Sequence, residues 1–211
     1  FSNHSRRRKQ LLSFASWIQG GSGLTTAVRV LEGEGPKMLK LQVEAEAELQ
    51  RDISEQNFSA FPLVLFASNL QIGVQSLVQS FGIGPLKGNT ILFNWLEQLH
   101  TGVLGLKEAS YTRSLWAAFR LGCNIVVLNA SEEGWYKVDS VPSEERRIDI
   151  WWWDDSTSHL MLLLAYLITR NDNWEEAKLR VLATTYEKKS EKSTEELRKI
   201  LDEVRIPAEP E

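Results

Sequence analysis

The sequence predicts an α/β protein with mainly parallel sheets flanked by helices. Amphipathic and extended segments alternate along nearly all of its 211 residues, as they do in chains of βαβ units. Some expected strands are continuous apolar runs, such as Pro62–Ala67, which is typical of parallel strands buried on both faces. The composition, 43% hydrophobic and 25% charged, is that of a folded chain and not of a disordered one.

The first elements follow from local periodicity. Residues 4–19 have apolar side chains near helical spacing and end at the glycine-rich residues 20–23, which stop a helix. Residues 24–31 alternate and are rich in β-branched side chains, so they predict a strand. Residues 37–56 carry apolar side chains on one face and charges on the other, which predicts an amphipathic helix.

The same alternation continues to the carboxyl end. Asn69 is the expected N-cap of the next helix, and Ser193 to Glu196 has the spacing of a capping box at the end of a solvated loop. Residues 131–147 are polar and predict a loop with one short strand at 135–138. The expected strands are 62–67, 90–95, 124–130, 147–153 and 178–186, and the expected helices are 70–81, 106–121, 158–171 and 194–204.

Two α/β halves are predicted, residues 1–105 and 106–211, which together form one domain. The leading helix has no strand before it, which is unusual for this architecture and predicts a first strand upstream of Phe1. The start at a residue other than methionine and the uncapped tail predict a piece of a longer polypeptide.

Composition excludes several classes of protein and site. The longest unbroken apolar run, Leu160–Ile168, has nine residues, whereas a spanning helix needs about 20. One cysteine excludes a disulfide scaffold and a multi-cysteine metal site, and three histidines leave little material for histidine chemistry. The formal net charge is −4, and no nucleic-acid partner is expected.

The carboxyl ends of the strands are where ligands bind in open α/β sheets, and only Asp154 and Asp155 place acidic side chains there. A magnesium site needs several oxygen ligands, but the neighbouring strand ends supply asparagine and serine instead. The favoured interpretation is that these carboxylates cap the following helix. No catalytic, metal or cofactor residue is therefore assigned, and the chain is predicted not to be an enzyme.

Two glycine-rich segments resemble functional loops but stand in the wrong context. The Gly82–Gly88 segment joins a helix to a strand, whereas phosphate loops run from strand to helix, so a tight connection with Gly82 ending the helix is favoured. The Gly20–Gly23 segment lacks the last glycine of a nucleophile elbow and precedes a strand. Cys123 opens an apolar strand and is expected to be a small buried hydrophobe.

Three other features have a structural and a functional interpretation. His159 is expected to be a capping or partly exposed residue at a helix start. The basic run Arg6–Lys9 is interpreted as a solvated helix face, although such runs also bind nucleic acid or lipid. The consecutive Trp151, Trp152 and Trp153 place alternate side chains on opposite strand faces, which suits either a core or a subunit interface.

The segment 148–183 resembles the cytoplasmic C-terminal domain of cation–chloride cotransporters. That family has the pattern I-D-[IV]-W-W, a polar turn, a leucine-rich helix, a tryptophan and a strand beginning K-[LM]-R. Segments 21–33, 66–95 and 204–211 resemble further strings of the family in the same order. The matching residues in 148–183 are Ile148, Asp149, Trp151, Trp152, Leu160–Leu164, Trp174 and Lys178–Arg180.

The resemblance implies a non-catalytic regulatory and dimerisation domain of a secondary transporter that couples chloride movement to sodium, potassium or both. It implies a homodimer through this domain, association with the transmembrane domain of the same polypeptide, and a place on the cytoplasmic side of the cell membrane. It also implies two universal-stress-protein-like halves. Some proteins of that type bind ATP through a glycine-rich segment after a strand, which this sequence lacks, so nucleotide binding is not expected.

Some features depart from the family pattern. The third tryptophan, the acidic pair after it and the lack of long phosphorylatable insertions point to a compact prokaryotic member. The alternative function is a universal-stress-protein-like module that binds a nucleotide or small anion beyond the strand ends. The α/β order, the polar strand ends and the Gly82–Gly88 segment are compatible with that alternative.

Overall fold

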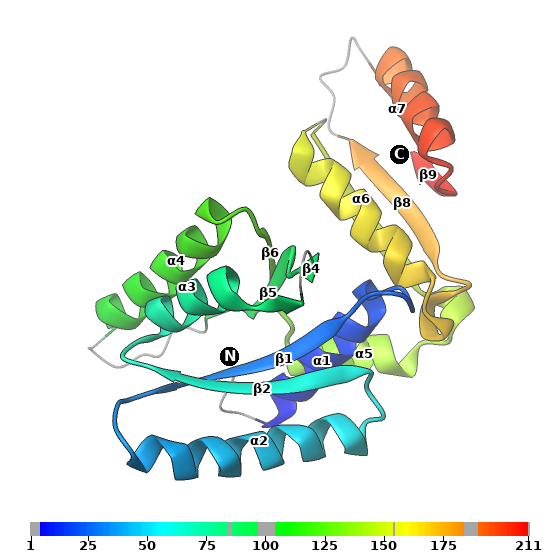
Figure 1. Ribbon diagram of the computed structural model, residues 1–211. Helices are drawn as coiled ribbons and strands as arrows, with labels where there is room; N and C mark the ends of the chain where they lie inside the picture. Colours follow the sequence, from blue (N-terminus) through cyan, green and yellow to red (C-terminus); the bar gives the residue numbers. More distant parts are fainter. Residues whose placement is uncertain (1–4, 84–85, 97–103, 154, 184–189, 211) are drawn as a thin grey trace. The chain divides into compact units, whose positions relative to one another are not determined.

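The computed structural model describes residues 5–83, 86–96, 104–153, 155–183 and 190–210, in which helices and strands alternate (Figure 1). The sheets are parallel except for one short antiparallel hairpin, and helices flank them, which confirms the predicted α/β class. The helices are α1 (Ser5–Ile18), α2 (Lys37–Glu55), α3 (Leu70–Ser80), α4 (Leu104–Arg120), α5 (Glu132–Ser140), α6 (Ser156–Thr169) and α7 (Ser190–Val204). The strands are β1 (Thr25–Glu32), β2 (Ala60–Ala67), β3 (Gly82–Ile83), β4 (Leu86–Lys87), β5 (Thr90–Asn94), β6 (Asn124–Leu128), β7 (Arg147–Trp152), β8 (Lys178–Ala183) and β9 (Ala208–Pro210).

The chain forms two compact units. The first unit holds Phe1–Ala15 and Leu24–Ser131, and the second unit holds Ser16–Gly23 and Glu132–Glu211. Helix α1 therefore begins in the first unit and ends in the second. These units are not the halves 1–105 and 106–211 expected from the sequence, and that division stays a prediction.

In the first unit, β1 pairs in parallel with β2 along the whole length of both strands. One face of this pair shares a core with α1 and α2. The other face meets α3, because a Cβ built on Gly73 would lie 2.6 Å from Val30 Cγ1. Helices therefore cover both faces of the pair (Figure 1). The buried residues shared with α1 and α2 are Leu12, Ala45, Leu49, Ile53 and Val64.

The first unit contains a second parallel pair, formed by β5 and β6. One face of this pair packs against α3 and α4 through buried Val74, Phe93, Ala118 and Cys123. Helix α3 consequently serves both pairs, since Gly73 approaches β1 and β2 whereas the next residue, Val74, packs with β5.

The second unit contains a parallel sheet in the order β7-β8-β9. Helices α6 and α7 share a core with one face of this sheet. The buried members of that core are Ile150, Trp152, Leu162, Ala165, Leu179, Val181, Leu197 and Leu201.

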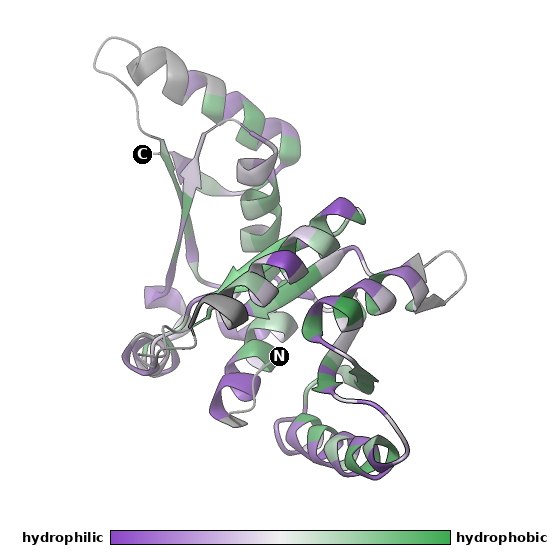
Figure 2. Ribbon diagram, turned by 90° about the vertical axis from the view of Figure 1, so that its left-hand side faces the viewer, coloured by the Kyte–Doolittle hydropathy of each residue, from purple (hydrophilic) through white to green (hydrophobic). Residues whose placement is uncertain are grey.

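The helices are amphipathic, as the sequence predicts for α2. Helix α2 buries apolar side chains such as Leu49 and Ile53 and exposes charged ones. Polar and apolar residues consequently interleave along the helical ribbons (Figure 2). Within the described residues, no helix combines the length and the hydropathy that crossing a membrane requires.

The predicted loop at 131–147 and its short strand at 135–138 are wrong, because α5 occupies most of this region. Acidic Glu132 and Glu133 in the first turn and Lys137 in the last turn complement the helix dipole. Glu133 and Lys137 also form an i,i+4 ion pair at 2.7 Å. The charges therefore favour a helix where the apolar alternation favours a strand.

Two element boundaries also differ from the prediction. Helix α7 begins at Ser190, so Ser193 lies inside the helix and is not the expected cap. Helix α3 ends at Ser80 with the extended residue Phe81 as its C-cap, and Gly82 belongs to β3 instead of ending the helix. The predicted Asn69 N-cap is confirmed, since its side chain accepts a hydrogen bond from Ile72 N–H at 3.0 Å.

Candidate functional site

The acidic pair after β7 contains a helix cap. The Asp155 carboxylate accepts hydrogen bonds from Ser158 N–H at 2.7 Å and from the Ser158 hydroxyl at 2.8 Å. The Ser158 hydroxyl in turn accepts from Trp153 N–H at 2.9 Å. The backbone hydrogen bond of Ser158, followed by its hydroxyl, lowers the pKa of Asp155. Asp155 thus stabilises the start of α6, which confirms the capping interpretation for this residue.

The described residues supply no metal centre around this cap. Nowhere among them do three His, Cys, Asp or Glu side chains gather in a way that could hold a metal ion. The Nδ1 atom of His159 lies 2.7 Å from the Asp155 carbonyl oxygen, and its ring lies 5.0 Å from the Trp152 ring. His159 is therefore the expected residue at the helix start, whereas Asp154, His4 and His100 lie outside the described residues.

The glycine-rich segments form connections. Residues 82–83 pair with 86–87 in the β3-β4 hairpin, and residues 84–85 lie outside the described residues. Gly20 and Gly21 have φ values of 61° and 76° directly after α1, which confirms the predicted helix stop.

Cys123 is buried, as expected for a small hydrophobe. Its Sγ lies 3.5 Å from the Gly88 carbonyl oxygen. Burial raises the pKa of the thiol, so Cys123 is a neutral thiol and not a nucleophilic thiolate at pH 7.

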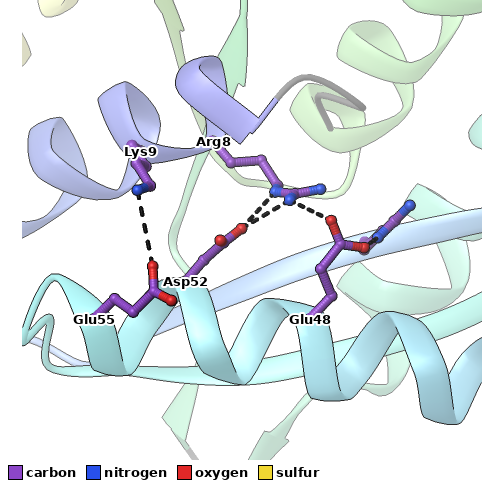
Figure 3. A network of polar contacts seen from close by, with 6 residues as sticks. Arg8, Lys9, Glu48, Asp52 and Glu55 are labelled. Atoms are coloured by element: carbon purple, nitrogen blue, oxygen red, sulfur yellow. Dashed lines mark hydrogen bonds and ion pairs between the residues drawn. The ribbon is translucent and has the colours of Figure 1, made fainter.

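The basic run at the start of α1 forms an ion-pair network with α2 (Figure 3). Arg8 is 7% exposed, and its guanidinium donates to Asp52 Oδ2 at 2.8 Å and to Glu48 Oε1 at 2.6 Å. The other Glu48 oxygen accepts from Arg29 Nη1 at 2.7 Å. Lys9 Nζ lies 3.9 Å from Glu55.

The electrostatics of this network are those of a structural contact. Burial by itself lowers the pKa of Arg8, but the hydrogen bonds and charges of Glu48 and Asp52 outweigh burial and raise it. Hydrogen bonds from Arg29 and then from Arg8 lower the pKa of Glu48. The predicted solvated helix face is therefore wrong at Arg8, whose charge is used to hold α1 on α2.

The tryptophans of β7 divide between the two faces of their strand, as predicted. Trp152 is buried in the core under α6, whereas Trp151 and Trp153 are 49% and 60% exposed. The exposed rings stack with centroids 6.4 Å apart, and we call them the tryptophan pair. On the same face, the Arg180 guanidinium donates to both carboxylate oxygens of Asp149 at 2.9 and 2.8 Å.

An aromatic cluster in the second unit gave no signal in the sequence beyond the high tryptophan count. The Trp17 ring stacks on Trp135 and meets Trp174 edge-on, each with centroids 5.0 Å apart. The Arg146 guanidinium lies 5.1 Å from the Trp174 ring centroid and donates to the Val141 carbonyl. Sequence separations of more than 100 residues hide such a cluster from local patterns.

The chain has clear similarity to known proteins. Residues 8–144 and 136–209 match the sequence profile of Solute carrier family 12. The chain belongs to this family. It is 30% identical over 212 residues to Potassium/chloride cotransporter 3 of Caenorhabditis elegans, an alignment that covers 97% of this chain and 19% of that relative.

Membership of Solute carrier family 12 confirms the resemblance to cation–chloride cotransporters. Segments 21–33, 66–95 and 148–183, which carry that resemblance, lie inside the matched ranges. The chain spans about a fifth of the relative's length. The relative is an animal protein, and the compact prokaryotic source stays a prediction.

Proposed function

We propose that this chain is the non-catalytic, cytoplasmic regulatory and dimerisation domain of a secondary transporter that couples chloride to potassium, sodium or both. The observation that carries the proposal is the 30% identity to a potassium/chloride cotransporter along 97% of the chain. The small share of the relative that is covered is compatible with a domain attached to a larger membrane protein.

Ion flux in cells tests the transport part of the proposal. Cells that make the full-length polypeptide should take up rubidium, as a potassium substitute, or sodium only when chloride is present. Deleting the region homologous to residues 1–211 should change the rate or regulation of that uptake at matched surface abundance. Uptake of neither cation, or uptake without a need for chloride, would contradict the proposal.

Sedimentation of the 211-residue chain tests the dimer. The tryptophan pair supports self-association, because exposed tryptophans are enriched at the centres of interfaces. The double variant Trp151→Ser/Trp153→Ser should sediment as a smaller species at concentrations where the parent dimerises. The control is Tyr136→Ser, which removes another exposed aromatic ring. A parent chain that stays monomeric at high concentration argues against the dimer.

An epitope tag after Glu211 of the full-length protein tests the cytoplasmic location. Antibody should label the tag only after the cell membrane has been permeabilised. Labelling of intact cells would place the domain outside.

The alternative, a nucleotide- or anion-binding module, gains no support from the Gly82–Gly88 segment. The described residues at both ends of that segment pair with each other in the β3-β4 hairpin. Calorimetry with ATP separates the two candidates, because saturable heat would favour the alternative.

A further inference from the structure

We infer that the first unit has an open strand slot between β1 and β5, and that an apolar strand of the same polypeptide, leading directly into α1, fills it. The starting observation is the strand pairing. Among the described residues, β1 pairs only with β2, and β5 pairs only with β6. Within that part of the chain, each of these strands therefore has one edge without a sheet neighbour.

Backbone alternation shows which groups of β1 face its open edge. Gly33 N–H, directly after β1, donates to the Ala67 carbonyl at 2.9 Å. Since backbone groups of a parallel strand alternate between its two sides, the odd-numbered residues of β1 face β2. Thr26, Val28 and Val30 direct their N–H and C=O groups to the opposite edge.

The same reasoning applies to β5. Asn124 N–H donates to the Asn89 carbonyl at 2.7 Å, and Trp95 N–H donates to the Leu128 carbonyl at 2.8 Å, so odd-numbered residues face β6. Thr90 and Leu92 face the open edge. The slot ends at Asn94, whose carbonyl accepts a hydrogen bond from Tyr111 Oη at 2.9 Å.

The outer edge of β2 is closed to a further strand. Even-numbered residues of β2 face outward by the same alternation, and Pro62 among them has no N–H to donate. The outward carbonyl of Val64 already accepts a hydrogen bond from Gln42 Nε2 at 2.7 Å. A new strand therefore fits the β1 edge and not the β2 edge.

Chain handedness places the entering strand on the same side. Helices α1 and α2 lie on one face of the β1-β2 pair, because Leu12 of α1 shares the α2 core. Connections between parallel strands through a helix are right-handed in nearly all proteins. Since β1 reaches β2 through α2, a strand that reaches β1 through α1 must lie on the other side of β1.

Helix α3 marks the far border of the slot. It lies on the opposite face of the β1-β2 pair (Figure 1), and the right-handed rule then puts β5 beyond the β1 edge, with β6 farther out through α4. Gly73 touches β1 and β2 while Val74 packs on β5, so α3 spans the interval between the pairs. The completed order is β2-β1-slot-β5-β6, a single doubly wound parallel sheet.

Amide hydrogen exchange tests the slot, using the 211-residue chain and the same chain extended by the residues encoded ahead of Phe1. In the unextended chain, the amides of Val28, Val30 and Leu92 should exchange faster than their neighbours Arg29 and Phe93. The extension should slow the first three amides by on the order of 100-fold, because they gain sheet partners. Arg29 and Phe93 already have partners and act as internal controls.

A second variant places two prolines in the apolar run of the extension and should abolish the added protection without changing α1. The inference is overturned if the encoded extension has no apolar run, if it protects neither edge, or if it protects only one. It is also overturned if Val28 and Leu92 are already as protected as Arg29 and Phe93. Concentration-dependent protection of the unextended chain would assign the slot to a second copy and overturn the proposed occupant. None of these results depends on the proposed transport function.

Discussion

At the residue scale, Asp155 and Ser158 satisfy the backbone at the start of α6. Replacing Asp155 by Ala should lower the free energy of unfolding by about 1 kcal/mol, because the first turn of α6 loses its cap. Asp155→Asn should retain most of the stability, since an amide oxygen can accept the same hydrogen bond. Urea unfolding measures both variants, with exposed Asp139→Ala as the control. Equal losses for Asp155→Ala and Asp139→Ala would contradict the capping role.

Glu48 should make stability depend on pH. Its pKa is lowered in the folded chain by Arg29 and Arg8, so its contribution is present above the unfolded pKa of about 4.3 and is lost as pH falls through the folded value. Glu48→Gln should cost about 1 kcal/mol at pH 7, a value discounted for the partly exposed carboxylate, and less in acid.

Urea unfolding at several pH values between 7 and 3 measures the Glu48 effect. Glu46→Gln is the control, because Glu46 is an exposed glutamate of the same helix. A difference between the parent and Glu48→Gln that stays constant down to pH 3 would rule out the ion pairs as its cause.

At the element scale, the approach of α3 to β1 and β2 requires a residue without a side chain. An added Cβ at Gly73 would lie 2.6 Å from Val30 Cγ1 and 3.2 Å from Val30 Cγ2. Gly73→Ala should destabilise the first unit by about 1–2 kcal/mol, since overpacking outweighs the better helix propensity of alanine. Thermal melting measures the loss, and Gly88→Ala is the control because a Cβ added there would meet nothing within 4 Å.

A double substitution separates overpacking from a change in helix propensity. Val30→Ala removes the methyl groups that an alanine at position 73 would meet. Gly73→Ala should therefore cost less in the Val30→Ala background than in the parent chain. An unchanged cost would show that the approach of α3 is not the reason for the glycine.

Local patterns in the sequence predicted the elements whose stability depends on an apolar period. Residues 37–56 and 62–67 belong to this class, and their boundaries differ from α2 and β2 by one or two residues. Helix α5 escaped prediction because Trp135 and Val138 alternate like a strand, while Trp135 stacks on Trp17 from the other end of the sequence.

The candidate site was predictable only where its chemistry is local. The Asp155 cap uses a residue three positions away, and the spacing alone predicts it. The partners of Arg8 lie 40 and 44 residues along the chain, on a helix that the pattern identifies but does not place. A basic run therefore looked solvated although one of its members is buried.

At the scale of the whole molecule, α1 contributes to both compact units, with Arg8 in the first and Trp17 in the second. Trp17→Ala should cost about 3–5 kcal/mol, because a buried indole and its packing on two other indoles are lost. Hydrogen exchange should show the loss mainly in the second unit, including α5. Trp116→Ala, which removes a 56% exposed ring, is the control. Equal destabilisation of both variants would show that the cluster contributes nothing specific.

The tryptophan cluster also sets a schedule for synthesis. A ribosome adds Trp17 early but adds Trp174 roughly 160 residues later, a delay of about 8–30 s at ordinary elongation rates. During that interval the apolar end of α1 has no finished surface to bury it. Newborn chains therefore present an exposed indole to chaperones until almost all of the polypeptide has left the exit tunnel.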